Sequence, residues 1–294
     1  MARPLRGGSD PASGVPADLR DEAGPDLSGL LELLFEDADL PVEQLPPPLA
    51  ELHDGELGFG KPLLYANFVA SLDGVTAVDP AASGQGGLIS GGLPADRFLM
   101  GLLRAFADVV LIGAGTLRAE ADHVWTPDRV YPPAADAYHR LREYLRLPPK
   151  VPLAVVSGSG AVDPTVPALA GGLILTTAAG ADRLAGRAPE GVKVIPLGVG
   201  DAISAAAVAG FLRSEGHRTI LTEGGPHLFG QLLSGGFVEQ LFLTVSPALA
   251  GRERDSTQIG MVEGTSLLPR IDIRGRLLSV RRSGSHLFLR YDLT

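Results

Sequence analysis

Short apolar runs alternate with amphipathic stretches along most of the chain from residue 62 onwards. The runs are rich in Val, Ile and Leu, which predicts buried strands at 62–70, 108–113, 151–156, 172–177, 192–197, 218–222 and 237–245. Between several of these strands, apolar residues at helical spacing predict helices at 94–107, 178–187, 201–214 and 225–234. This alternation predicts an α/β fold with a mostly parallel central sheet and helices on both faces.

The pattern changes after Pro247. Two strand-like segments, 271–281 and 285–292, meet at a Ser-Gly-Ser sequence and predict a C-terminal antiparallel hairpin at the sheet edge. The Arg281-Arg282 pair before the turn is interpreted as a solvated edge that discourages pairing with another chain. Residues 62–294 are therefore predicted to form one α/β domain.

The first 61 residues differ from this domain. Residues 1–26 are rich in Pro, Gly, Ala and Asp without a hydrophobic period, which predicts a disordered tail. Leucines at helical spacing predict a short amphipathic helix within 27–40, which Pro41 and the prolines at 46–48 are expected to end. Residues 27–61 are thus expected to form a leader with one short helix.

Composition removes several classes of function. The 294 residues are 45% hydrophobic, which suffices for a buried core. Lys+Arg 25 against Asp+Glu 34 gives a net charge of −9, unfavourable for binding nucleic acid or anionic membranes. Without cysteine there are no disulfides or thiolate metal sites, and the six histidines lack His-x-His or HExxH spacing, so we expect no metal. No apolar segment follows the N-terminal arginines, so we expect a cytoplasmic protein without a membrane span.

Three turns that follow predicted strands carry candidate chemistry. Gly113-Ala114-Gly115-Thr116 allows the backbone to approach a phosphate or a nicotinamide, although a tight structural turn explains it equally well. Thr222-Glu223-Gly224-Gly225-Pro226 opens a helix whose free N–H groups suit an anion. Ala70-Ser71-Leu72-Asp73-Gly74 is an acidic turn. Because carboxyl ends of parallel strands share one rim, we expect the three turns to converge there.

The same turns, together with Leu103-Arg104-Ala105 and Leu243-Thr-Val-Ser-Pro247, resemble the reductase domain of bifunctional riboflavin-biosynthesis deaminase/reductases. The chain is more similar to stand-alone pyrimidine reductases of that family, over roughly 62–292. The resemblance implies a dihydrofolate reductase-like fold, NADPH as cofactor and a homodimer. A deaminase domain is not expected, because its zinc signature needs cysteine.

The resemblance also implies roles for individual residues. Cofactor contacts are expected from Ser90, Gly113, Ala114, Gly115, Thr116, Glu120, Gly224, Gly225, Pro226, His227 and Leu228. Substrate contacts are expected from Asn67, Arg104 and Glu223. Reduction needs a hydride and a proton, and Asp73 and Glu223 are the carboxylates expected nearest to the reaction. Glu223 would bind a polar edge of the substrate, and Asp73 would hold its turn or relay a proton.

Two departures from the family bear on the substrate. The bifunctional enzymes have a lysine on the first strand where this chain has Asn67. They also have an Asp-Asp-Pro run with a downstream arginine for the ribose phosphate, where this chain reads Glu120-Ala-Asp122-His123-Val-Trp125 with Arg129 as the candidate arginine. The main hypothesis is an NADPH-dependent reductase of a small heterocycle, similar to 5-amino-6-(5-phosphoribosylamino)uracil reductase. Alternatives are a dihydrofolate- or pterin-reducing activity and a catalytically idle NADP-binding protein. Trp125 is interpreted as a packing residue.

Overall fold

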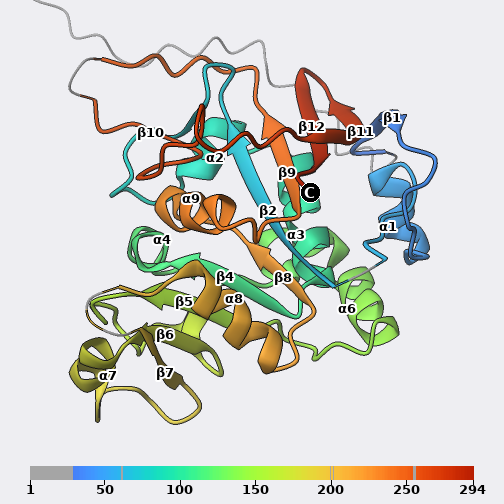
Figure 1. The fold of residues 1–294 in the computed structure, drawn as a ribbon. Helices are drawn as coiled ribbons and strands as arrows, with labels where there is room; N and C mark the ends of the chain where they lie inside the picture. The colour runs from blue at the N-terminus through green and yellow to red at the C-terminus, as the bar shows by residue number, and fades with distance from the viewer. Residues whose placement is uncertain (1–28, 61, 199, 201, 254–255) are drawn as a thin grey trace, which may run out of the picture.

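A computed structural model describes residues 29–60, 62–198, 200, 202–253 and 256–294 (Figure 1). In this part of the chain the main sheet has the order β1-β11-β12-β9-β2-β8-β4-β5-β6-β7, and β10 pairs with β3 separately. The strands are β1 (Glu32–Glu36), β2 (Leu63–Ala70), β3 (Val75–Ala77), β4 (Val109–Gly113), β5 (Leu153–Ser157), β6 (Leu173–Thr177), β7 (Lys193–Gly198), β8 (Thr219–Thr222), β9 (Gln240–Val245), β10 (Ile259–Gly260), β11 (Arg276–Ser283) and β12 (His286–Asp292).

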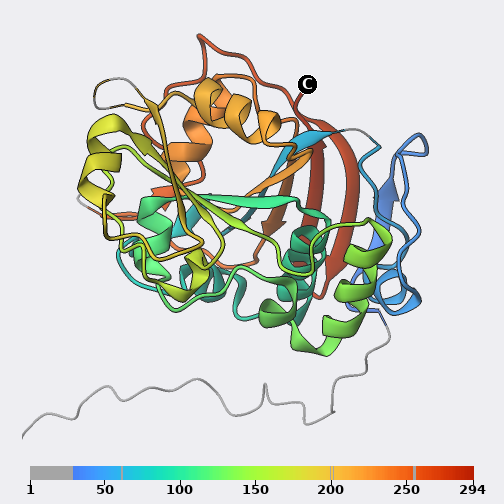
Figure 2. The same ribbon diagram turned by 90° about the horizontal axis from the view of Figure 1, so that it is seen from below.

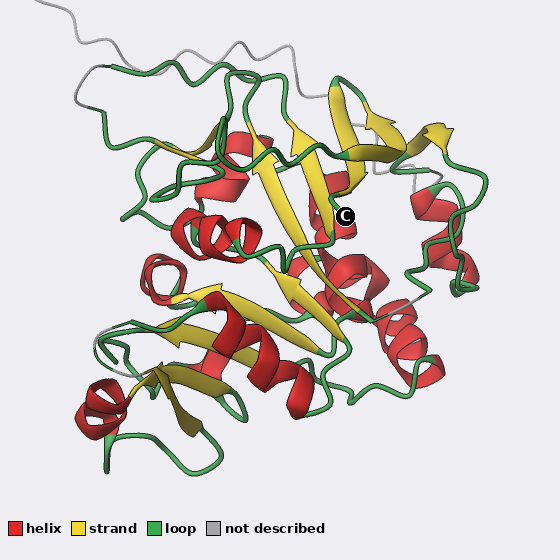
Figure 3. Cartoon of the chain, viewed as in Figure 1, coloured by secondary structure: helices red, strands yellow, loops and turns green. Residues whose placement is uncertain are grey.

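Helices flank this sheet (Figure 3). They are α1 (Pro47–His53), α2 (Gln85–Ser90), α3 (Pro94–Phe106), α4 (Ala114–Ala119), α5 (Pro127–Val130), α6 (Ala135–Tyr144), α7 (Ala178–Leu184), α8 (Ala205–Ser214) and α9 (Pro226–Ser234). Two short 3-10 helices lie at Pro132–Ala134 and Pro167–Leu169.

The predicted fold class is confirmed. Strands β9, β2, β8, β4, β5, β6 and β7 pair in parallel with their neighbours, and all seven lie within or beside the predicted runs. The predicted hairpin is β11 and β12, which adds antiparallel strands beside β9. The four predicted helices are α3, α7, α8 and α9, although α8 begins later than predicted, at Ala205 after the N-cap Ser204.

Helices cover both faces of the sheet (Figure 2), and the buried apolar residues form two hydrophobic cores. On β2, Tyr65 points into the core formed with α1, α3 and α6, whereas the preceding Leu64 points into the core formed with α8 and α9. This alternation is what the pleat of a strand buried on both faces requires. The uninterrupted apolar runs therefore correspond to strands that are covered by helices on both faces, as predicted.

Helix α3 is held from both ends and along its buried side. Pro94 occupies the first turn, where a missing N–H costs nothing, and Phe98 and Leu102 are fully buried. At the other end Arg142 of α6 donates to the carbonyls of Arg104, Ala105 and Ala107 at 3.2, 3.1 and 2.9 Å. A cation on the last carbonyls of a helix satisfies them and complements its dipole.

The N-terminal segment corrects two predictions. The described part of 27–40 contains a strand, β1, instead of the predicted helix, and β1 pairs antiparallel with β11. The open edge of β11 offers this segment a backbone partner that leucine spacing alone does not reveal. The prolines at 46–48 start a helix instead of ending one, because Pro is well accommodated in the first turn of α1. The predicted tail, 1–26, lies outside the described residues.

Arg281 was interpreted as solvated, and this is wrong. Its side chain is 4% exposed and pairs with Glu36 of β1 at 3.0 Å. Its Nε donates to the carbonyl of His53 at 2.8 Å. Because β1 pairs with β11, the Arg281 side chain is buried between β11, β1 and α1, and its two contacts connect these three elements.

Candidate active site

The turns β4–α4 and β8–α9 meet at the carboxyl rim of the sheet. Gly224 has φ +157°, and a Cβ there would lie 2.8 Å from Thr116 Oγ1. Gly225 has φ +75°, and its Cβ would lie 3.6 Å from Gly113 Cα. A Cβ on Gly224 would clash with the Thr116 side chain, and the positive φ of Gly225 is one that residues other than glycine rarely adopt. The two motifs found in the sequence therefore form one surface, as expected.

Helix α9 starts in this surface. Pro226 is its first residue, and no side chain caps the helix N-terminus within the described structure. The free N–H groups and the helix dipole at this end favour an anion. Leu228 is buried, so it anchors the first turn of α9 against the core. On the facing turn, Ala114 begins α4, and a Cβ on Gly115 would meet nothing within 4 Å.

Arg104 and Glu223 form a buried ion pair at the same rim. Arg104 Nε lies 3.0 Å from both carboxylate oxygens, and Nη2 lies 2.6 Å from Oε2. The side chains are 2% and 6% exposed. Arg104 Nη1 is buried without a partner among the described atoms. Because an unmade hydrogen bond of a buried guanidinium is costly, this donor is available for a ligand atom.

Asn67 shares the sheet face of this pair. It lies on β2 opposite Phe242 of β9, is half-buried, and belongs with Tyr65 to the side covered by α3. Tyr65 fixes β2 against α3, because its hydroxyl donates to the Leu103 carbonyl at 2.6 Å. The three residues expected to contact substrate therefore come from β2, α3 and the end of β8 and lie on one face.

Asp73 takes part in a different contact. Its carboxylate accepts from the Ser71 hydroxyl at 2.6 Å and from the backbone of Ala250 and Gly251 at 3.1 and 2.7 Å. These hydrogen bonds, led by that of Ser71, lower the pKa of Asp73 to about 2. Asp73 is exposed and ties the β2–β3 turn to the 250–251 loop. This geometry favours the turn-holding role over the proton relay.

Two expected cofactor residues make contacts within the protein. Glu120 accepts from the backbone N–H of Gly84 at 2.6 Å and thereby joins the end of α4 to the start of α2. His227 lies against the loop after β10, where a Cβ on Gly264 would come within 2.7 Å of its Nδ1. Both residues therefore hold loops that border the turn surface.

Ser90 is the last residue of α2 and is buried. Its carbonyl lies 3.1 Å from His286 Nε2 of β12. Its side chain also lowers the pKa of Asp96, a buried carboxyl in the first turn of α3, although burial raises that pKa overall. The structure therefore links Ser90 to a buried carboxyl that the sequence analysis did not single out.

One further residue near Arg104, His123, was given no role by the sequence. His123 has a buried Nε2 without a partner among the described atoms, and burial, then the charge of Arg104, lowers its pKa to about 4. Its ring packs edge-to-face on Trp125, with centroids 4.8 Å apart. Trp125 is buried, which agrees with the packing interpretation. The sequence showed only that the Glu120–Trp125 segment differs from the family, and this difference could have pointed to His123.

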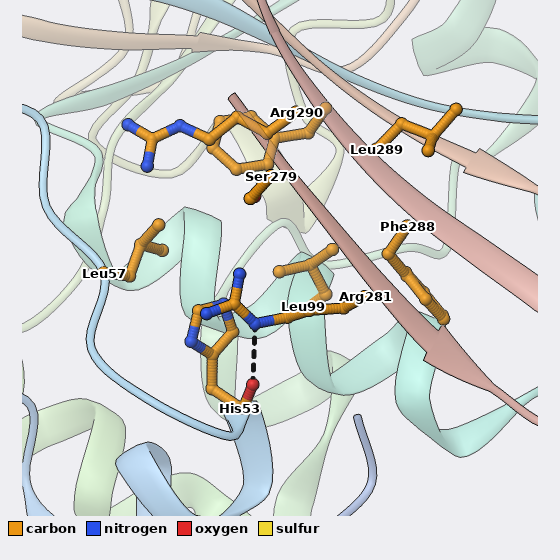
Figure 4. A pocket seen from close by; sticks show the side chains of 9 residues that line it. His53, Leu57, Leu99, Ser279, Arg281, Phe288, Leu289 and Arg290 are labelled. Atoms are coloured by element: carbon orange, nitrogen blue, oxygen red, sulfur yellow. Dashed lines mark hydrogen bonds between the residues drawn. The ribbon is translucent and has the colours of Figure 1, made fainter. Parts of the chain in front are cut away.

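A small cavity lies elsewhere in the molecule (Figure 4). Its volume is about 10 Å³, and His53, Leu99, Arg281 and Phe288 are among the lining residues. That volume is about the space for one water molecule. None of the expected catalytic, cofactor or substrate residues lines it. It belongs to the junction of α1 with β11 and β12.

Comparison of the chain with known proteins identifies its family. The family model of the RibD C-terminal domain matches residues 62–289. The chain belongs to that family. It is therefore an oxidoreductase of the riboflavin-biosynthesis reductase type that uses a nicotinamide cofactor, and the predicted family is confirmed. A search of curated proteins finds no significant match.

Solved structures of reductases share the fold at low identity. A pyrimidine reductase-like protein from Corynebacterium diphtheriae has TM-score 0.57 and 22% identity, over 79% of this chain and 92% of that one. A deaminase/5-amino-6-(5-phosphoribosylamino)uracil reductase from Thermotoga maritima has TM-score 0.56 and 16% identity, over 80% and 57%. The riboflavin biosynthesis reductase of Saccharomyces cerevisiae has TM-score 0.52 and 13% identity, over 81% and 92%.

Proposed function

We propose that this reductase uses NADPH to reduce a small heterocycle similar to 5-amino-6-(5-phosphoribosylamino)uracil. The observation that carries the proposal is the position of the Arg104–Glu223 pair beside the two glycine turns. A buried pair with a free Nη1 donor suits a polar, planar ligand, whereas the bare turns suit a phosphate. The expected homodimer and cytoplasmic location belong to this proposal. Among the described residues, no helix is long and apolar enough to cross a membrane.

The residues of the rim fit the cofactor. Gly224 and Gly225 leave open backbone where a Cβ would fill the turn, and the α9 N-terminus offers unsatisfied N–H groups. These turns would hold the pyrophosphate, with Gly113 to Thr116 facing it. When bound, NADPH supplies the hydride. The protein orients the substrate with Arg104 and Glu223 and holds the surrounding loops with Asp73 and Glu120.

The substrate side leaves one alternative supported by an observation. Asn67 replaces the lysine of the bifunctional enzymes, and His123 stands in the segment that replaces Asp-Asp-Pro. A neutral amide and a neutral imidazole are poor partners for a ribose phosphate, which favours an unphosphorylated pterin such as dihydrofolate as the second candidate. A catalytically idle NADP-binding protein would bind cofactor without turning over either compound.

The test combines cofactor binding with turnover. The apparent stability of the purified protein is measured with NADPH and NADH in parallel, since a ligand that binds only the folded state raises it by about 2.7 kcal/mol at 100 times Kd. Oxidation of NADPH is then followed with the phosphoribosylaminouracil and with dihydrofolate. Stabilisation by NADPH beyond NADH and turnover of the first substrate support the proposal. Stabilisation without turnover of either supports the idle protein, and the absence of both effects contradicts an NADPH enzyme.

A further inference from the structure

The carboxyl rim of the sheet continues beyond the two glycine turns. The strand order β2-β8-β4-β5-β6 places Asn67 on β2 and Glu223 at the end of β8 on one side of the β4–α4 turn. The ends of β5 and β6 lie on its other side, about 5 and 10 Å from β4 at the usual spacing of strands. A dinucleotide whose pyrophosphate lies at the turns and whose nicotinamide faces the substrate residues therefore extends its adenosine half over the ends of β5 and β6.

The loop that follows β5 binds two arginine side chains. Arg118 of α4 donates from Nη1 to the Ala161 carbonyl at 3.2 Å, and Arg183 of α7 donates from Nη1 to the Ser159 carbonyl. Helices α4 and α7 follow β4 and β6 directly, so both begin at the same end of the sheet (Figure 1). Two guanidinium groups from the two neighbouring strand–helix units thus meet carbonyls that are two residues apart in one loop.

Close backbone packing fixes this loop. Gly160 has φ +66°, and a Cβ there would lie 2.5 Å from the carbonyl oxygen of Gly180 in α7. The hydroxyl of Thr177, the last residue of β6, donates to the Gly158 carbonyl at 2.8 Å. Arginines that bind a loop of this kind are already restrained near one position, which reduces the entropy lost when they bind a ligand.

No carboxylate neutralises the two arginines. Arg118 and Arg183 are exposed, and neither takes part in a salt bridge within the part of the chain that the structure describes. Asp163, the acid closest to the loop in sequence, accepts from the Thr165 hydroxyl at 2.7 Å instead. Because the whole chain carries a net charge of −9, two uncompensated cations at the rim provide a local attraction for an anion that the rest of the surface does not favour.

We propose that Arg118 and Arg183 bind the 2′-phosphate of NADPH and thereby select NADPH over NADH. A carbonyl takes one of the five N–H donors of a guanidinium, and the remaining donors form the planar fork that suits phosphate oxygens. The 2′-phosphate is the group by which NADPH differs from NADH, so side chains that bind it change one affinity without the other. This inference rests on the proposed function and names the residues that set its cofactor preference.

The first test measures binding without turnover. Titration calorimetry on wild-type protein compares NADPH with NADH, and adenosine 2′,5′-bisphosphate with adenosine 5′-monophosphate. We expect the member of each pair that carries the 2′-phosphate to bind about tenfold or more tightly, because hydrogen bonds to a charged group are gained. Equal affinities within each pair overturn the inference, whether or not the protein reduces any substrate.

The second test assigns the preference to the two side chains. Arg118→Gln and Arg183→Gln are each expected to weaken binding of NADPH and of the bisphosphate by about tenfold, with the affinities for NADH and the monophosphate near wild type. Arg140→Gln makes the same change of charge at an exposed position of α6 and serves as the control that keeps the preference. A ratio of NADPH to NADH affinity within about threefold of the control in both arginine variants overturns the inference.

The ratio of affinities separates recognition of the phosphate from support of the loop. A variant that only loosens the loop weakens NADPH and NADH together and leaves their ratio unchanged, which contradicts the inference. Arg118→Lys keeps the charge but loses the planar fork, so we expect a ratio between those of wild type and Arg118→Gln.

The two tests also separate this inference from the proposed activity. If wild type binds the bisphosphate through these arginines but reduces neither the phosphoribosylaminouracil nor dihydrofolate, the proposed activity fails and the 2′-phosphate site stands. If wild type reduces a substrate and the arginine variants keep the full preference for NADPH, the activity stands and the assignment of the two arginines is wrong.

Discussion

At the scale of single residues, the Arg104–Glu223 pair shows that the effect of a buried charge on stability depends on its partner. Glu223 occupies two nitrogens of Arg104 and leaves Nη1 free. Removing one partner of a buried pair leaves an uncompensated charge, which costs more than the pair itself contributes. The pair is therefore sensitive to any change that keeps the shape but removes the charge.

Glu223→Gln makes that change. We expect the free energy of unfolding to fall by roughly 3–5 kcal/mol, because Arg104 remains buried without its carboxylate. We also expect kcat/KM to fall at least tenfold, about 1.4 kcal/mol, with NADPH affinity largely kept. Urea denaturation and initial rates measure the two effects, with exposed Glu215→Gln as control. Turnover equal to that of the control would remove Glu223 from the mechanism.

Sequence predicts the residues of this site unevenly. Glu223 and the glycines follow a strand and open a helix, so their position at the rim is predictable from the strand order alone. His123 gives no such signal, because a single polar residue in a loop is ordinarily solvated. Only the packing of Trp125 against it creates its environment, and that packing is a property of the folded chain.

At the scale of elements, the contact between the β4–α4 and β8–α9 turns decides where a phosphate can lie. Thr116 and Gly224 meet so closely that a methyl group on Gly224 has no room. The sequence predicts each turn but not their contact, since the two are more than a hundred residues apart. The seven strands were predictable from uninterrupted apolar runs, whereas polar α6 and the strand β1 were not.

Gly224→Ala tests the turn contact. The new Cβ would lie 2.8–2.9 Å from the Thr116 side chain, so the turn must shift away from it. We expect NADPH affinity to fall by roughly tenfold and stability by about 1–3 kcal/mol. Gly216→Ala is the matched control, with φ +93° and no neighbour within 4 Å. Equal NADPH affinities of the two variants would contradict a cofactor site at this turn.

Helix α1 brings a buried histidine to the junction shown in Figure 4. Burial, then the charge of Arg281, lowers the pKa of His53 from 6.5 to about 3. Below pH 6.5 His53 is protonated in the unfolded chain, whereas in the folded protein it stays neutral down to about pH 3. The free energy of unfolding therefore decreases as pH falls through this window, by up to about 1.4 kcal/mol per pH unit.

His53→Gln removes this contribution to the pH dependence. Urea denaturation at about pH 7 and about pH 4.5 is expected to show a smaller acid loss in the variant than in wild type. His139→Gln, at an exposed position of α6, serves as control and keeps the wild-type acid loss. An acid loss in His53→Gln as large as in the control would show that His53 titrates normally in the folded state.

At the scale of the whole molecule, the N-terminal segment extends the sheet by one strand. Strand β1 occupies the edge of β11, and Glu36 neutralises the buried Arg281. A free edge strand is a template for pairing with another chain, and with β1 in place the open edge is this five-residue strand instead of the eight-residue β11. The rim that carries the expected cofactor residues belongs to the parallel half and does not include β1.

A chain lacking residues 1–40 therefore tests whether β1 affects the antiparallel part of the sheet without affecting the rim. We expect the free energy of unfolding to fall, because Arg281 loses Glu36 and β11 loses its backbone partner, and we expect association through the exposed edge of β11. Light scattering measures the added mass, and NADPH affinity of the remaining monomeric fraction stays near wild type, since the turns are untouched. A chain lacking only 1–28 keeps β1 and is the control. If both chains have the same oligomeric state and the same free energy of unfolding, then β1 neither limits association through β11 nor stabilises Arg281.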